Sequence, residues 1–345
     1  MDALIVGAGM SGLMAARTLR DRGYAVQLIE RGRSVGGRMA TRRVGSGGLA
    51  DHGAQFFTVR SDALQGYVDR WLAQGLVYIW GTGWSDGSVK RTAGDGHPRY
   101  ACRGGMNALA KHLASELDLR VNRLATRIER DESGWTLEDS AGDVYRARGL
   151  IMTPPAPESL ALLTNNGVYL QAEVQAALQR IRFGPCLCGI HEIEGEADLP
   201  APGAMQNFQA DVYWVADNRA KGISRTAIVT SHASAKYSRQ NWDAPEADII
   251  RELESAVQPH LKAGARIVRT QLKKWRYSVP LTTHAEDCLL ADMRPPLVFA
   301  GDAFGGRGRV EGAFLSGIAA GAALADALAY YSSRPLRIPV GRRGG

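Results

Sequence analysis

The hydrophobic pattern at the start of the chain predicts a strand, a helix and a second strand. Residues 3–6 form a continuous apolar run, which is typical of a buried strand. Residues 11–22 carry apolar side chains at helical spacing, and residues 25–30 again favour a strand. This order is typical of a βαβ unit in a parallel sheet.

The pattern changes twice further along the chain. Up to residue 152 it predicts one more helix, over residues 107–116, and three strands, over residues 120–130, 135–137 and 144–152. The prolines between residues 154 and 157 end this run. Between about residues 159 and 274, short strand-like runs (187–193, 212–215 and 226–231) surround a predicted helix at 246–256. From residue 297 the chain returns to a strand, a glycine-rich loop and a helix over 312–329.

We therefore predict two domains built from interleaved segments. The length of 345 residues exceeds what one hydrophobic core usually serves. The expected fold is α/β combined with α+β, with a Rossmann-type nucleotide-binding domain and a β-rich substrate domain. The first takes residues 1–59, 97–156 and 284–331, the second takes 60–96 and 157–283, and residues 332–345 form a flexible basic tail.

Composition narrows the class of protein. With 45% hydrophobic and 22% charged residues, the chain lies in the ordinary soluble range. No basic segment precedes the first apolar run, which argues against a signal peptide, and the apolar stretch 312–331 is interrupted by Ser316, Asp326 and glycines, which favours a packed helix over a membrane span. The four cysteines show no metal-binding spacing, so we expect buried thiols and no metal site. Without a secretion signal, a reducing compartment fits, so we expect a cytoplasmic location.

The net charge of +7 raises the question of nucleic-acid binding. Part of the excess comes from four arginines after residue 333, and the rest of the chain has no recognisable nucleic-acid-binding module. We therefore predict no nucleic-acid partner. The positive charge better suits an anionic small molecule.

A glycine motif joins the first strand to the first helix. Gly7, Gly9 and Gly12 match the pattern GxGxxG, in which the first glycine permits a tight turn, the second lets a pyrophosphate approach and the third allows close helix–strand packing. The start of the helix offers free N–H groups to phosphate. Glu30 ends the second strand, where a carboxylate can accept hydrogen bonds from ribose hydroxyls. The combination predicts a dinucleotide site.

Two further segments distinguish FAD from NAD. Gly37 and Arg38 belong to a second glycine loop after Glu30, which simple nicotinamide dehydrogenases do not need, and Arg38 can reach phosphate or flavin. Near the C-terminus, Asp302 follows an apolar strand and can accept a hydrogen bond from the ribityl chain. The helix that begins near Glu311 can place N–H groups beside the flavin carbonyls. Together these segments predict an FAD site.

One motif points elsewhere. Residues 83–87 match the GxSxG pattern of a nucleophile elbow, which requires a helix after the serine. Residues 88–92 are instead polar and β-like, so we interpret the motif as a loop.

These residues resemble the FAD-dependent amine oxidase superfamily and, within it, bacterial renalase-like proteins. The superfamily segments are 7–12, 30, 36–39, 104–106, 301–302, 311–313 and 316–317. More specific to the renalase-like group are residues 51–58 (DHGAQFFT), 213–218, 230–234 and 274–280. The resemblance extends to about residue 331 and implies a p-hydroxybenzoate-hydroxylase-like FAD domain.

The motifs and the resemblance together predict the cofactor contacts. They are Gly7, Gly9, Ser11, Gly12, Glu30, Arg31, Gly37, Arg38, Gln55, Phe56, Ile128, Gly301, Asp302, Glu311 and Ala313. This chain departs from related bacterial proteins at residues 304–308, where a glycine-rich loop replaces an aromatic residue and a cysteine. No C-terminal cysteine is placed for covalent attachment, so FAD should be bound non-covalently.

By resemblance, the expected activity is oxidation of the 2- and 6-dihydro isomers of NAD(P), with FAD passing the electrons to O2 and H2O2 as product. Such a dihydropyridine requires no general base, because its ring nitrogen drives hydride transfer, and the chain shows no obvious acid–base constellation. His232, Trp275 and Tyr277 are the substrate-side candidates. The alternatives are an amine oxidase, an isoprenoid or porphyrin desaturase, and a non-catalytic flavin-binding protein.

Overall fold

The computed structural model describes residues 1–87 and 96–333. Its centre is a six-stranded sheet, ordered β17-β18-β11-β1-β2-β7, which is parallel apart from the antiparallel strand β17. The strands are β1 (Ala3–Val6), β2 (Val26–Glu30), β7 (Asp118–Val121), β11 (Gly149–Met152), β17 (Leu289–Met293) and β18 (Pro296–Phe299).

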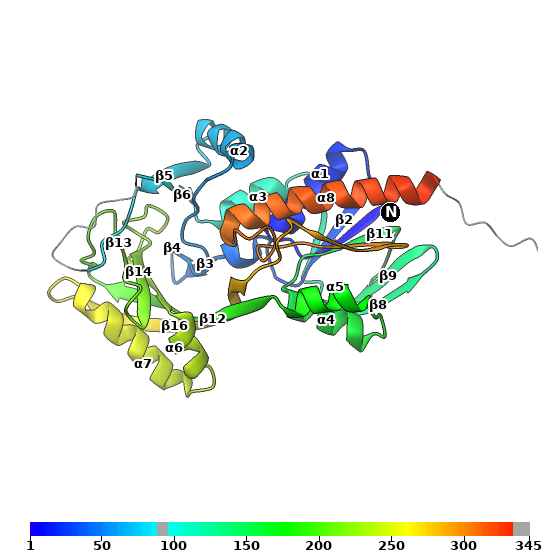
Figure 1. Ribbon diagram of the computed structural model, residues 1–345. Coiled ribbons are helices and arrows are strands. Elements are labelled where there is room, and N and C mark those ends of the chain that lie inside the picture. Colours follow the sequence, from blue (N-terminus) through cyan, green and yellow to red (C-terminus); the bar gives the residue numbers. More distant parts are fainter. Residues whose placement is uncertain (88–95, 334–345) are drawn as a thin grey trace, which may run out of the picture.

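Layers cover both faces of this sheet (Figure 1). On one face α1 (Met10–Asp21), α3 (Asn107–Ala114) and the long α8 (Arg309–Ser333) share an apolar core, and α8 packs closely on α1 because Gly317 and Gly321 leave no room for a Cβ. On the other face lie α4, α5 and a small antiparallel sheet, ordered β10-β9-β8. Their bounds are α4 (Ala156–Asn165), α5 (Ala172–Gln179), β8 (Ala125–Asp131), β9 (Gly134–Asp139) and β10 (Val144–Ala147).

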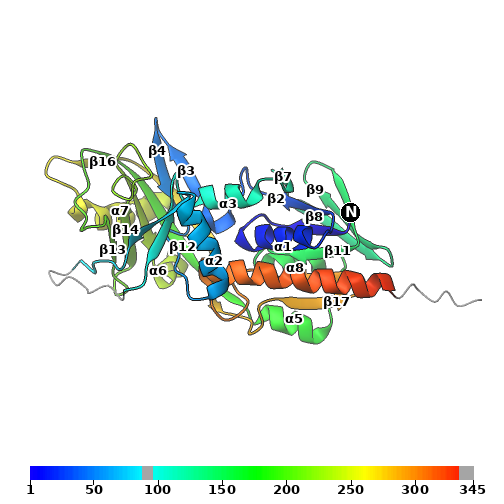
Figure 2. The same cartoon turned by 90° about the horizontal axis from the view of Figure 1, so that it is seen from above.

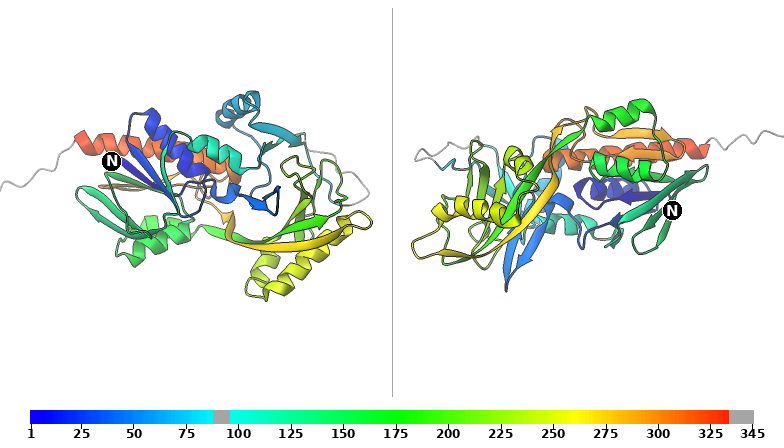
Figure 3. Two further views of the ribbon diagram at one scale, coloured as in Figure 1. Left: turned by 180° about the vertical axis from the view of Figure 1, so that it is seen from behind. Right: turned by 90° about the horizontal axis from the view of Figure 1, so that it is seen from below.

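A five-stranded antiparallel sheet, ordered β13-β14-β15-β12-β16, forms the second half of the molecule (Figures 2 and 3). Its strands are β12 (Arg182–Glu194), β13 (Ala204–Gln206), β14 (Val212–Asp217), β15 (Ile228–Ala233) and β16 (Arg266–Thr282). The helices α6 (Ala235–Gln240) and α7 (Glu246–Val257), with the 3-10 turn η2 (Gln258–His260), lie on this side of the molecule. Side chains of α7 share a core with one face of the five-stranded sheet, the outer face. The opposite, inner face of this sheet is turned toward the nucleotide-binding half.

The remaining elements connect the two halves. A hairpin of β3 (Thr41–Val44) and β4 (Gly48–Asp51) packs Val44 and Ala50 against the inner face of the five-stranded sheet. The helix α2 (Asp62–Ala73) shares the core of α1 and α8, so this part of the predicted substrate segment 60–96 packs with the nucleotide-binding half. The strands β5 (Val77–Gly81) and β6 (Arg99–Cys102) form a separate pair, and the 3-10 turn η1 (Gly37–Met39) precedes β3.

The structure corrects several predicted boundaries. The predicted strand 120–130 is two strands in different sheets, because the chain turns at Asn122, whose φ of 55° lies in the left-handed region. The predicted strand 144–152 is also two strands: β10 alternates exposed and buried residues, whereas β11 is buried throughout. Beyond these, β16 is 17 residues long, and α2, α4 and α5 were not predicted.

The C-terminal helix extends further than predicted. It runs to Ser333, two residues into the expected tail, while residues 334–345 and the β-like segment 88–92 lie outside the described residues. By length and composition, residues 309–330 could cross a membrane, with a mean hydropathy of 1.5. More than half of this window is buried inside the protein, which is typical of a core helix.

Candidate flavin site and substrate face

The three glycines of the first motif perform three different tasks. Gly7 has a φ of 97°, and a Cβ there would collide with the Thr153 hydroxyl, so the tight turn requires glycine. A Cβ on Gly12 would overlap the carbonyl of Gly7, which explains the close approach of α1 to β1. A Cβ on Gly9 would meet no atom within 4 Å, so the space in front of this residue is open.

The start of α1 is prepared for an anion. The helix begins at Met10, and its N-cap residue Gly9 supplies no side-chain hydrogen bond. Ser11 is 4% exposed, yet its buried hydroxyl has no partner among the described residues. Unpaired N–H groups and a hydroxyl at a helix N-terminus suit a pyrophosphate.

Glu30 organises the turn beside this helix. Its Oε2 accepts a hydrogen bond from the N–H of Ala8 at 2.9 Å, and its Oε1 accepts one from Gly32 at 2.7 Å. Each carboxylate oxygen has a second acceptor position, so ribose hydroxyls can still bind. The neighbouring Arg31 points to Glu158 at 3.1 Å and is 60% exposed in its side chain.

Arg38 and Asp302 connect an N-terminal and a C-terminal segment of the chain, 264 residues apart. Arg38 donates two hydrogen bonds to the Asp302 carboxylate, at 2.7 and 2.6 Å, and also reaches the carbonyls of Tyr277 and Ser278 at 3.3 and 3.4 Å. With Phe183, the pair lines a small cavity at the carboxyl ends of β11 and β18. Ligands of open α/β sheets bind at this edge, so the pair lies where the predicted cofactor contacts should meet.

Three other predicted contacts have defined surroundings. Gln55 donates from Nε2 to the carbonyls of Asp51 and Gly53, while its buried Oε1 has no partner among the described residues. Phe56 lies in an aromatic cluster with Trp80, Trp84 and Trp214. Glu311 accepts three hydrogen bonds at Oε1, from the backbone N–H groups of Arg60 and Ser61 and from the Ser61 hydroxyl, so its carboxylate holds the segment before α2.

The other predicted contacts lie inside the core or close to it, apart from Gly37, which is exposed. The side chain of Ile128 is fully buried, and the residue pairs with Leu137 in β9. Ala313 packs from α8 against the core of α1, and Gly301 donates its N–H to the Ser316 hydroxyl at 2.9 Å. Gly37 has a φ of 51° and lies against Gly9, which places the second glycine loop beside the first.

The structure brings His232 and Trp275 together at His52. The Trp275 ring stacks on the His52 ring with centroids 5.3 Å apart, and Trp275 donates from Nε1 to the His52 carbonyl at 2.7 Å. His232 also bonds the His52 backbone, and its buried Nε2 has no partner among the described residues. Tyr277 lies apart from this group, edge-on to Phe183 at the Arg38 end of β16.

Both histidines are neutral at pH 7. Burial lowers the pKa of His52 to about 3, with further lowering by Lys273, His232 and Arg42. Burial also lowers the pKa of His232 to about 4, although its hydrogen bond to the His52 backbone opposes the shift. The inner face of the sheet therefore carries two neutral, buried imidazole rings, each with a buried nitrogen that has no partner among the described residues.

These shifts predict a loss of stability in acid. His191, on the outer face, also has its pKa lowered by burial to about 3, so three histidines stay neutral in the fold and bind protons near pH 6.5 when unfolded. Their stabilisation is full above pH 6.5 and is lost as the pH falls toward 3–4, at about 1.4 kcal/mol per pH unit for each histidine. Urea midpoints of the holoprotein between pH 7.5 and 4.5 should decrease accordingly.

Two variants separate this effect from general acid denaturation. His191→Gln should flatten the profile, since it removes one of the three groups, whereas His112→Gln changes an exposed residue and should leave the profile unaltered. Equal midpoints at pH 7 and pH 5 would contradict the prediction.

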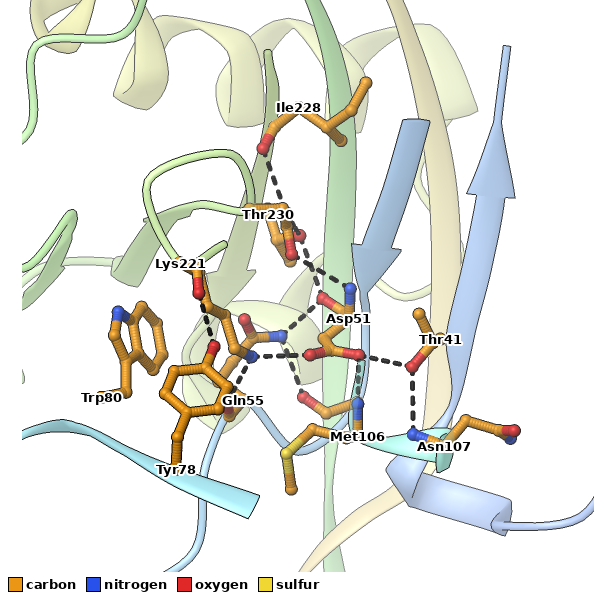
Figure 4. Close-up of polar contacts among 12 residues, drawn as sticks. Thr41, Asp51, Gln55, Tyr78, Trp80, Met106, Asn107, Lys221, Ile228 and Thr230 are labelled. Atoms are coloured by element: carbon orange, nitrogen blue, oxygen red, sulfur yellow. Dashed lines mark hydrogen bonds and ion pairs between the residues drawn. The ribbon is translucent and has the colours of Figure 1, made fainter. Parts of the chain in front are cut away.

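Sequence reasoning missed a buried ion pair behind Gln55 (Figure 4). Lys221 donates to Asp51 Oδ2 at 2.6 Å and to the Gln55 carbonyl at 2.5 Å, and both side chains of the ion pair are fully buried. The Lys221 ammonium lies 4.7 Å from the Trp80 ring centroid. Nothing marks Lys221 in the sequence, because it lies in a polar loop after β14. The aspartate at the end of the apolar strand β4 was the one available signal.

Comparison with known proteins defines the class of protein. Residues 73–325 match the family model described as flavin containing amine oxidoreductase, and residues 5–71 match an NAD(P)-binding Rossmann-like domain. The chain belongs to the flavin-containing amine oxidoreductase family, and it is an FAD-dependent oxidoreductase. This membership confirms the predicted fold class and cofactor.

Two solved structures share this fold, and one relative matches a short segment of the chain. Cyclohexylamine oxidase from Brevibacterium oxydans superposes with a TM-score of 0.71 over 95% of this chain and 99% of that chain, at 16% identity. Putrescine oxidase bound to putrescine gives 0.67 over 94% and 98%, at 15% identity. An L-amino acid dehydrogenase from Synechocystis is 46% identical over 55 residues, which span 16% of this chain and only 12% of that protein.

The residues in place fit FAD. The open space at Gly9, the unpaired Ser11 hydroxyl and the Glu30 carboxylate match pyrophosphate and ribose, and Arg38 with Asp302 lies at the sheet edge nearer the second domain. Within residues 1–87 and 96–333, no group of three or more His, Cys, Asp or Glu side chains is placed to hold a metal ion.

Proposed function

We propose that the protein is renalase-like and oxidises the 2- and 6-dihydro isomers of NAD(P). The observation that carries the proposal is the neutral His52–Trp275 stack with His232 on the inner face of the five-stranded sheet. Bound FAD would accept hydride and pass the electrons to O2, with H2O2 as product. The protein's own part is to hold a planar ring against aromatic walls and to exclude water.

The protonation states support this substrate class. Removal of hydride from a dihydropyridine requires no base, and neither His52 nor His232 can gain or lose a proton near neutral pH. The Asp51 carboxylate is neutralised by Lys221 and buried, so it does not act as a base either. Positioning of the ring is then the main contribution of this face.

The second candidate is oxidation of an amine. It is favoured by the family model and by the fold shared with cyclohexylamine oxidase and putrescine oxidase. The two candidates differ in the substrate that bleaches the flavin. Anaerobic mixing of the holoenzyme with 2- or 6-dihydro-NAD should bleach it rapidly, primary amines should do so slowly, and air should then yield H2O2. Rapid bleaching by an amine and no response to either isomer would overturn the proposal.

Trp275→Ala tests the role of the inner face. Loss of the indole removes the stacking surface of His52 and the hydrogen bond to its carbonyl, so the flavin should be reduced about 10-fold or more slowly while FAD stays bound. Stopped-flow absorbance measures the rate, and the flavin-to-protein ratio reports binding. Trp275→Phe keeps an aromatic wall and should lie between wild type and Trp275→Ala. Wild-type rates in Trp275→Ala would remove this residue from the substrate face.

A further inference from the structure

Arg309 begins α8 in a backbone conformation that favours glycine. Its φ is 62°, and the preceding Gly305, Gly306 and Gly308 also have positive φ values, between 64° and 75°. Arg309 is the fourth residue of this loop with a positive φ, and its Cβ makes that left-handed conformation unfavourable. Residues held in this region cluster at functional sites, where the surrounding structure enforces them.

The loop that precedes Arg309 lies against the Asp302 loop, β16 and the segment that follows β16. A Cβ on Gly308 would lie 3.4 Å from Pro280 of β16 and 4.0 Å from the Asp302 carbonyl. The loop is also tied to the segment after β16, because Gly305 donates to the Glu286 carbonyl at 2.7 Å and Gly306 to the His284 carbonyl at 3.2 Å. Arg309 therefore follows directly on the point where the Asp302 loop meets β16.

The guanidinium of Arg309 is available to a ligand. The residue is exposed, and the guanidinium makes no hydrogen bond or ion pair with another residue in the described part of the chain. Its charge nevertheless acts across the site: burial raises the pKa of Tyr213 on β14, and Arg309 opposes that shift. Tyr213 lies 6.4 Å from the His232 ring and stacks on Phe208, so the charge of Arg309 acts on an aromatic side chain beside His232.

The charged side chains that act on the two histidines are cations. Lys273 and Arg42 act on His52, and Lys221 acts on His232, in each case lowering the histidine pKa. The carboxylates of Asp51 and Asp302 are each paired with a cation. A protonated amine would be repelled here, whereas a phosphate would be attracted and could take two hydrogen bonds from a guanidinium.

We propose that Arg309 determines substrate specificity by binding the phosphate next to the nicotinamide ring, so that the site selects an anionic nucleotide over a protonated amine. This inference rests on the proposed function, because it names the part of the dihydronicotinamide nucleotide that the residue recognises. The contact stabilises the bound ground state and the transition state equally. Its main effect is therefore on substrate binding and not on the rate of hydride transfer.

The test compares two ligands that differ in one phosphate. Dihydronicotinamide mononucleotide and dihydronicotinamide riboside isomers carry the same ring, and their oxidised forms serve as equilibrium probes through the flavin spectrum. Wild-type holoenzyme should bind the mononucleotide about 10- to 100-fold more tightly, as a charged hydrogen bond provides. This preference should shrink as salt increases. In Arg309→Gln the preference and its salt dependence should both disappear.

Arg307→Gln is the matched control, because it removes the same charge two residues earlier, where the guanidinium bonds Asp287 at 2.7 Å. It should keep the full preference. Arg309→Gly accommodates the positive φ, so it should lose the preference without a lower melting temperature. An undiminished preference in Arg309→Gln, or an equal loss in Arg307→Gln, would overturn the inference. If neither dihydro compound reduces the flavin, the proposed function fails, while the equilibrium titrations still decide the role of Arg309.

Discussion

Gly9→Val should yield a folded protein without flavin. Gly9 has φ −75° and ψ −178°, an extended conformation that valine adopts readily, and a Cβ there meets no protein atom within 4 Å. The same space is the approach of the pyrophosphate to the start of α1, so the valine methyl groups would occupy it. Wild-type protein should be yellow and release intact FAD on denaturation, and the variant should be colourless. The ratio of flavin absorbance to protein absorbance measures the difference, and circular dichroism checks the fold.

Other positions of the site provide graded controls. Glu30→Ala should weaken FAD binding without abolishing it, because the ribose contacts are lost, about 1.5–3 kcal/mol for hydrogen bonds to a charged group. Gly66→Val is a remote glycine on α2 at which a Cβ also meets no atom within 4 Å, so it should retain full flavin content. Equal flavin content in Gly9→Val and wild type would show that this turn is not the cofactor site. Flavin that stays with the denatured chain would contradict non-covalent binding.

Lys221→Met should destabilise the protein by about 3–5 kcal/mol, because it leaves the Asp51 carboxylate buried without its cation. Asp51 would keep hydrogen bonds from the Thr41 hydroxyl at 2.5 Å and from the N–H of Met106 at 2.9 Å, which do not neutralise its charge. The Gln55 carbonyl would also lose its partner. Urea unfolding of the holoprotein, followed by tryptophan and flavin fluorescence, measures the change.

A double variant separates charge from packing. Lys221→Met with Asp51→Asn removes both charges and should recover much of the lost stability, since an uncharged buried pair carries no unpaired ion. Lys262→Met breaks the exposed pair with Glu196, 2.7 Å long, and should change the midpoint little. If Lys221→Met unfolds at the wild-type midpoint, the buried ion pair is not important for stability.

The nucleotide-binding half was predictable because its signals are local. Gly7 and Gly12 each satisfy a requirement of backbone geometry within a few residues, Gly9 leaves open space at the start of α1, and the buried strands β1 and β11 are continuous apolar runs. The same locality explains the errors. The apolar content of residues 144–152 did not show that the chain leaves one sheet and enters another. The sheet that a strand joins depends on the strand beside it, and β11 pairs with β1, which is distant in the sequence.

The sequence by itself determined the flavin motif, the order of its segments and the family that they resemble. The resemblance also named His232 and Trp275, but their arrangement around His52 was decided only by the tertiary structure, since the three residues come from segments far apart in the chain. Lys221 becomes a buried cation only when β4 supplies Asp51, and His52 becomes neutral only when Trp275 and the five-stranded sheet remove it from water. Burial and charge pairing depend on what the fold places nearby, and those neighbours are more than 150 residues away along the chain.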